Sequence, residues 1–141
     1  MRRKRKIIYI AHPIAGDIQG NIKRVLEICR QVHTKAIIPV APYILSLQYL
    51  NDEVKRDRRL GVDAGLEYFY RRYIEELWLF GDKISQGMIR EITCALKVRG
   101  IPIFAKTKGT QEVYHRILKQ IQLAEDRKSL KRMRCGPGYP D

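Results

Sequence analysis

Residues 75–91 read EELWLFGDKISQGMIRE, an apolar run followed by a glycine, a polar loop and the start of a helical pattern. Residues 75–81 predict a buried strand, and the segment from about residue 86 to 98, closed by Gly100, predicts a helix. Ser85 stands at the N-cap position, where a hydroxyl caps a helix and backbone N–H groups can hold an anion. Glu91 follows one turn later at the border of the buried face. Its spacing leaves open whether it is a surface glutamate or part of a site.

The rest of the chain continues this alternation of strands and helices. Three more apolar runs predict strands, at residues 6–11, 36–42 and 101–105. One helical pattern begins after Asp17, which can cap it. Two more span residues 44–73 and 110–130. We therefore expect an α/β fold, a Rossmann-like (flavodoxin-like) three-layer sandwich with a mainly parallel sheet of four or five strands. Ligands in such folds lie beyond the carboxyl ends of the strands, so the loops after Ala11, Pro42 and Phe80 are candidate sites.

The net charge of +13 is concentrated at the ends of the chain. Residues 2–6 carry +5, residues 116–135 carry +5 and Asp141 carries −1, so residues 7–115 carry the remaining +4. We predict a basic N-terminal arm at 1–6, an α/β domain at 7–124 and a basic C-terminal tail at 125–141. Basic ends attract polyanions without reading their sequence, so nucleic acid is a possible but not a favoured partner.

Cysteine usage and hydropathy exclude several other classes of protein. The three cysteines lack the spacing of a disulfide framework or a zinc site, so we expect no metal and no cofactor. No apolar run is long enough to cross a membrane, and the start of the chain has no signal-peptide pattern. We expect a cytoplasmic protein without a membrane partner.

Several polar residues near the predicted strand ends are candidates for a site. His12 follows the first strand, and Gly16 could help the next helix N-terminus to hold an anion. Asp63 and Glu67 lie four residues apart, an arrangement that suits either paired carboxylates in sugar chemistry or a solvated acidic face. The pattern alone leaves both interpretations open.

With these residues, the chain resembles the nucleoside 2-deoxyribosyltransferase superfamily, and within it the 2′-deoxynucleoside 5′-phosphate N-hydrolases. The resemblance covers residues 6–105 and rests on Tyr9 in IIYIA, Glu67 in GLEYF, SQGMIRE at residues 85–91 and GIPIF from Gly100. It implies that Glu91 is the nucleophile at C1′ of the sugar, either forming a glycosyl-enzyme or stabilising an oxocarbenium-like centre, and that Tyr9 orients its carboxylate. Glu67 would contact the substrate near the scissile bond.

The resemblance also implies a substrate and a substrate-binding set. Ser85, in place of the aspartate that the nucleoside-using transferases carry, favours a nucleoside 5′-monophosphate because a serine does not repel phosphate. The expected binding residues are Ser85, Gly87, His12, Gly16 and Asp82. We therefore expect a hydrolase or transferase acting on an N-glycosidic bond, which as in its relatives would be a homodimer or larger homo-oligomer.

Two departures and two alternatives accompany this expectation. His12 and Pro13 stand where active hydrolases of the family carry a turn with glycine and serine, and glutamate replaces the usual aspartate at residue 67. The chain could instead be a non-catalytic nucleotide-binding module of the same fold. It could also be a nucleic-acid-associated protein that works through its basic ends.

Overall fold

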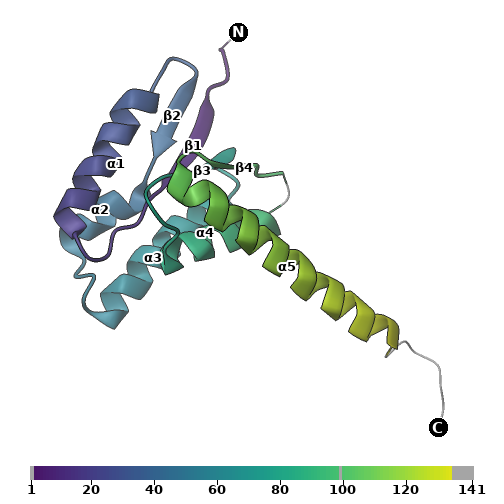
Figure 1. Ribbon diagram of the computed structural model, residues 1–141. Helices are drawn as coiled ribbons and strands as arrows, with labels where there is room; N and C mark the ends of the chain where they lie inside the picture. The colour runs from purple at the N-terminus through teal and green to yellow at the C-terminus, as the bar shows by residue number, and fades with distance from the viewer. Residues whose placement is uncertain (1, 99, 135–141) are drawn as a thin grey trace.

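The computed structural model describes residues 2–98 and 100–134, in which strands and helices alternate (Figure 1). The elements in chain order are β1 (Lys6–Ala11), α1 (Ile18–Val32), β2 (Ile37–Val40), α2 (Pro42–Tyr49), α3 (Lys55–Tyr70), β3 (Glu76–Leu79), α4 (Gln86–Lys97), β4 (Ile103–Ala105) and α5 (Lys108–Arg134). The predicted strands are present but mostly shorter than their apolar runs.

The region expected to be helical between residues 44 and 73 consists of two helices, α2 and α3. Pro42, expected at the end of a strand, is the first residue of α2, where its fixed φ suits a helix and its missing N–H is not needed. A turn separates the helices, and in it the Asn51 N–H donates to Asp57 Oδ2 over 2.9 Å. The apolar residues of this region follow no single helical period because they belong to two helices with different buried faces.

The four strands form one sheet in the order β2-β1-β3-β4, and every pairing is parallel. This order is that of a flavodoxin-like doubly wound sheet, and it confirms the predicted Rossmann-like α/β class. The chain reverses its direction of travel between β1 and β3. A parallel sheet opens a crevice at such a switch point, beyond the carboxyl ends of the two strands.

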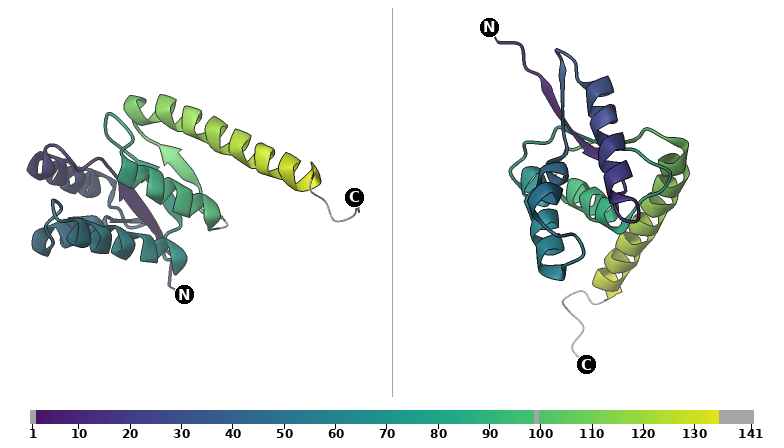
Figure 2. Two further views of the ribbon diagram at one scale, coloured as in Figure 1. Left: turned by 90° about the horizontal axis from the view of Figure 1, so that it is seen from below. Right: turned by 90° about the vertical axis from the view of Figure 1, so that its left-hand side faces the viewer.

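Alternate residues of β1 face two separate apolar layers. Ile8 and Ile10 pack with Val25 of α1 on one face of the sheet. Tyr9 and Ala11 pack on the other face, against the layer that contains Phe69 of α3 and several residues of α4. The sheet therefore lies between α1 on one side and α3 and α4 on the other, as Figure 2 shows from below. This three-layer arrangement explains why β1 is apolar at every position from Ile7 to Ala11.

Helix α5 is continuous through residue 124, where the sequence placed the end of the domain. Residues 125–134 extend this helix, and side chains 122–133 are all exposed. Its later turns stand clear of the other elements in Figures 1 and 2. Residues 135–141, the remainder of the predicted tail, lie outside the described residues. In the part of the chain that the structure describes, no helix is both long and apolar enough to cross a membrane.

Candidate active site

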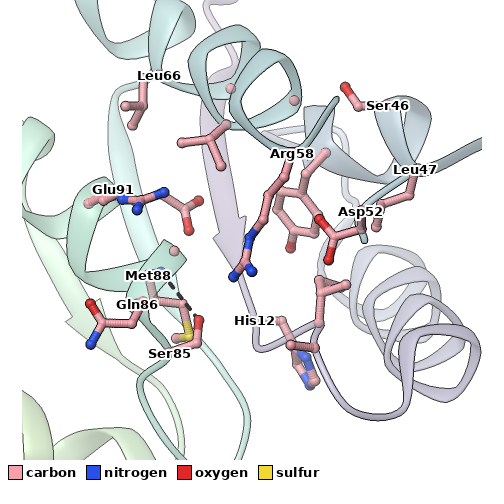
Figure 3. Close-up of a pocket in the computed structure, with 18 of the residues that line it drawn as sticks. His12, Ser46, Leu47, Asp52, Arg58, Leu66, Ser85, Gln86, Met88 and Glu91 are labelled. Atoms are coloured by element: carbon pink, nitrogen blue, oxygen red, sulfur yellow. Dashed lines mark hydrogen bonds between the residues drawn. The ribbon is translucent and has the colours of Figure 1, made fainter. Parts of the chain in front are cut away.

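A cavity of about 420 Å³ opens at the switch point of the sheet. One wall is formed by α2 and α3, and the opposite wall by the loop after β3 and the first turns of α4 (Figure 3). Its floor includes the end of β1. This volume falls within the range of small-molecule sites. The cavity is also where the fold class places a ligand.

The cavity brings together five of the residues that the sequence singled out. They come from β1 and its following turn and from the start of α4, and they are Tyr9, His12, Ser85, Gly87 and Glu91. These segments are more than 70 residues apart in the chain, and the parallel pairing of β1 with β3 places them side by side.

Glu91 is the most perturbed carboxyl group of the cavity. Its Oε2 atom is buried and has no hydrogen-bond partner among the described residues. Burial raises the pKa of this carboxyl to about 8, while the Tyr9 hydroxyl acts in the opposite direction as a hydrogen-bond donor. The carboxyl is therefore mostly protonated at neutral pH when the cavity is empty. A buried carboxyl with a raised pKa and an unsatisfied oxygen is a feature of functional sites.

Tyr9 is held beside Glu91 by tight packing. Its side chain is 2% exposed, and its ring lies 4.8 Å from that of Phe69. Burial, followed by the neighbouring Glu91 charge, raises the pKa of Tyr9 well above its ordinary value, so the phenol keeps its proton. A Cβ atom at Gly65 of α3 would lie 3.0 Å from the Tyr9 hydroxyl. Gly65 therefore leaves the space in which this hydroxyl sits.

The start of α4 forms an anion-binding end of the cavity. Ser85 is the N-cap, as predicted, and its Oγ accepts a hydrogen bond from the Met88 N–H over 3.3 Å. Ser85 and Gly87 both line the cavity, and Gly87 has no side chain to cover its backbone. The partial positive charge of the helix end makes this a favourable place for a phosphate or another anion.

His12 lies on the floor of the cavity with one ring nitrogen already engaged. Its Nδ1 is 2.6 Å from the Pro13 carbonyl oxygen. Because a carbonyl only accepts, Nδ1 donates, and in the neutral ring Nε2 is the free acceptor. Gly81 has a φ of 101°, and a Cβ there would lie 2.6 Å from Pro13 Cδ. Glycine at this position lets the β3–α4 loop close against the turn that carries His12.

Glu67, predicted to contact the substrate, does not line the cavity. Its side chain is 54% exposed and accepts a hydrogen bond from Arg71 Nε over 2.9 Å. A helix turns about 100° per residue, so Gly65 and Leu66 face the cavity while Glu67 points away from it. The solvated acidic face was the correct interpretation of Asp63 and Glu67.

Gly16 and Asp82 also lie outside the cavity. Gly16 provides a turn with a φ of 97°, but the helix end that follows it is already capped by Asp17, whose Oδ1 accepts from the Gly20 N–H. A carboxylate at that position disfavours a bound anion. Asp82 is exposed at the start of its loop, and its backbone packs against Gly109 of α5.

The wall formed by α2 and α3 was missed by the sequence analysis. Its residues include Tyr43, Ser46, Leu47, Arg58, Gly61 and Val62. Tyr43 donates a hydrogen bond from its hydroxyl to the Ile10 carbonyl oxygen over 2.6 Å, which fastens α2 to β1. The spacing of residues 58, 61, 62, 65, 66 and 69 is that of one helix face. This regular spacing was the available signal, but two glycines and an arginine concealed it.

Comparison with known proteins identifies a family. No curated protein matches the chain. The model of one family, a domain of unknown function called DUF7768, matches residues 6–106, which contain the whole sheet and every residue of the cavity. Because this match covers more than half of the chain, the protein belongs to the DUF7768 family.

Proposed function

We propose that the protein cleaves or transfers the N-glycosidic bond of a nucleoside 5′-monophosphate, with Glu91 acting at C1′ of the sugar. The observation that carries this proposal is the buried Glu91 carboxyl beside Tyr9, with an oxygen that no described residue satisfies, in a cavity of about 420 Å³. The earlier resemblance to the deoxyribosyltransferase superfamily supports the same assignment through Tyr9 and residues 85–91.

The spacing along α4 fits a sugar phosphate. Gly87 and Glu91 are four residues apart, so they are separated by about 6 Å of helix rise. Side chains on a helix lean toward its N-terminus, which brings the Glu91 carboxyl back toward the capped end. A phosphate held at Ser85 and Gly87 would place the sugar over Glu91. The base would then face the apolar part of the wall formed by α2 and α3, which includes Leu47 and Val62.

The proposed reaction has two displacement steps. In the first, an ionised Glu91 oxygen attacks C1′, and the C1′–N bond breaks. The base leaves with the electron pair of that bond and takes a proton from water. In the second, water or an acceptor base attacks C1′ and gives a proton to the hydroxide formed in the first step, the bond to Glu91 breaks, and the carboxylate is restored. Positive charge develops on the sugar in both steps, and a desolvated carboxylate stabilises it.

The raised pKa of Glu91 also favours a second candidate function. A protonated carboxyl can donate a hydrogen bond to a bound base or sugar, as a nucleotide-binding module requires, without attacking C1′. Glu67 is exposed and does not line the cavity, so we assign it no role in the proposed reaction. We keep this non-catalytic module as the alternative proposal.

Base release distinguishes the two functions. Ribo- and deoxyribonucleoside 5′-monophosphates are incubated with the protein, with and without a free acceptor base, and the products are separated by chromatography. The enzyme proposal expects free or exchanged base with the wild type and none with Glu91→Gln, while Glu67→Gln on the exposed face of α3 keeps activity. Binding of a monophosphate without any base release would favour the binding module and reject the enzyme.

The resemblance further supports a homo-oligomer, and we also propose that the protein is located in the cytoplasm. We propose a dimer or larger assembly, and light scattering of the purified chain tests it. A mass equal to one chain at all concentrations would reject the assembly without affecting the proposed chemistry.

A further inference from the structure

Arg58 is an exposed cation on the face of α3 that lines the cavity. Arg58, Gly61, Val62, Gly65 and Leu66 all line the cavity, and Phe69 continues the same face into the core. Arg58 is the one cation among the α3 residues that line the cavity, and the neighbouring Asp57 is the one anion among them. A charged side chain at the outer end of a helix face that is otherwise small and apolar indicates that it contacts a ligand in the cavity.

No described residue neutralises the Arg58 side chain. It forms no hydrogen bond and no ion pair within residues 2–98 and 100–134. Asp57 lines the same cavity, but one of its oxygens accepts from the Asn51 N–H and neither oxygen pairs with Arg58. In the view of Figure 3 the guanidinium points into the cavity, in the direction of Ser85 and His12. Arg58 is exposed to solvent and has no ion-paired partner among the described residues, so its guanidinium is free to bind a ligand anion, although Asp52 and Asp57 line the same cavity.

The opposite wall offers matching donors. Ser85 and the backbone of Gly87 lie at the positive end of α4, so the two walls present donors and positive charge to the same space. The unsatisfied Oε2 of Glu91 is an independent sign that a ligand completes this cavity. An anionic group with several oxygens suits both walls, because a guanidinium fork binds two phosphate oxygens at once.

We propose that Arg58 grips the 5′-phosphate from the α3 wall and makes the cavity select a nucleoside monophosphate over the free nucleoside. This inference rests on the proposed function of the same cavity, and it adds the residue that sets substrate class. Arg58 acts on binding and takes no part in the displacement at C1′.

Calorimetric titration of Arg58→Met tests the inference without requiring turnover. The probes are the common ribo- and deoxyribonucleoside 5′-monophosphates and the matching nucleosides. Arg59→Met is the matched control. Arg59, like Arg58, is exposed on α3, but it does not line the cavity, and its replacement by methionine removes the same charge. We expect Arg58→Met to weaken monophosphate binding by about 10- to 100-fold, the range of a charge-assisted hydrogen bond. Nucleoside binding should change by about twofold at most, and Arg58→Lys should recover part of the loss.

Three outcomes would overturn the inference. Equal losses of monophosphate affinity in the Arg58 and Arg59 variants would show that the effect comes from the net charge of the protein and not from the position of Arg58. Equal weakening of nucleoside and monophosphate would place Arg58 against the base or sugar. If the wild type binds no monophosphate, the inference and the proposed function both fail. If it binds one through Arg58 but releases no base, only the catalytic proposal fails.

Discussion

Replacing Glu91 by glutamine should stabilise the protein, and the gain should grow as pH rises. The carboxyl has an ordinary pKa of 4.5 in the unfolded chain and a pKa of about 8 in the folded protein, chiefly because of burial. Between these values the folded state binds the Glu91 proton more tightly than the unfolded state does. The free energy of unfolding therefore falls with rising pH through this window and levels off above it.

The size of the effect follows from the same two pKa values. Each pH unit within the window removes ~1.4 kcal/mol of stability, so the wild type loses about 3 kcal/mol between pH 5 and pH 7.5 through this group. Glutamine does not titrate and has nearly the same shape, so Glu91→Gln avoids this loss. For a chain of this length the difference in melting temperature between the two proteins should widen by on the order of 10 °C.

Thermal unfolding followed by circular dichroism at several pH values between 5 and 8 measures this difference. Glu67→Gln is the control, because it removes a carboxylate from the exposed face of α3. A gain for Glu91→Gln that is the same at every pH, or a loss of stability, would show that the Glu91 carboxyl is not desolvated in the folded protein. Such a result would remove the main observation behind the proposed function.

The remaining predictions concern turnover and the walls of the cavity. If Glu91 attacks as a carboxylate, kcat/KM should rise about tenfold per pH unit below its pKa of about 8 and level off above it, whereas a falling profile would assign it the role of an acid. Gly65→Ala places a Cβ 3.0 Å from the Tyr9 hydroxyl and should lower kcat about tenfold. Gly61→Ala, whose Cβ makes only ordinary contacts at 3.7 Å, should change kcat little. Equal effects on kcat in the two variants would contradict the role of Gly65. Ser85→Ala should cost about 1 kcal/mol of stability as a lost N-cap and raise KM for a monophosphate, both measurable by thermal unfolding and steady-state kinetics, and an unchanged KM would exclude Ser85 from the phosphate site.

The β-strands and the N-terminal end of α4 could be predicted because their signals are local. β1 is apolar at consecutive positions because both of its faces are covered, and a run of this kind is visible in any short window of sequence. Ser85 caps α4 through a bond to a residue three positions away. Local geometry of this kind depends on few neighbours, so residue type and spacing are enough to anticipate it.

The sequence by itself thus determined the parallel α/β class, the helix end at Ser85 and the position of Glu91 after β3. Tertiary structure decided which faces of α2 and α3 are buried, and with that the exclusion of Glu67 and the presence of Arg58 in the cavity. It also decided the pKa of Glu91, because the burial that raises this pKa and the Tyr9 hydroxyl that opposes the rise both depend on groups brought together by the fold. Helical phase and desolvation both depend on what packs against a residue, and the order of amino acids within one segment does not contain that information.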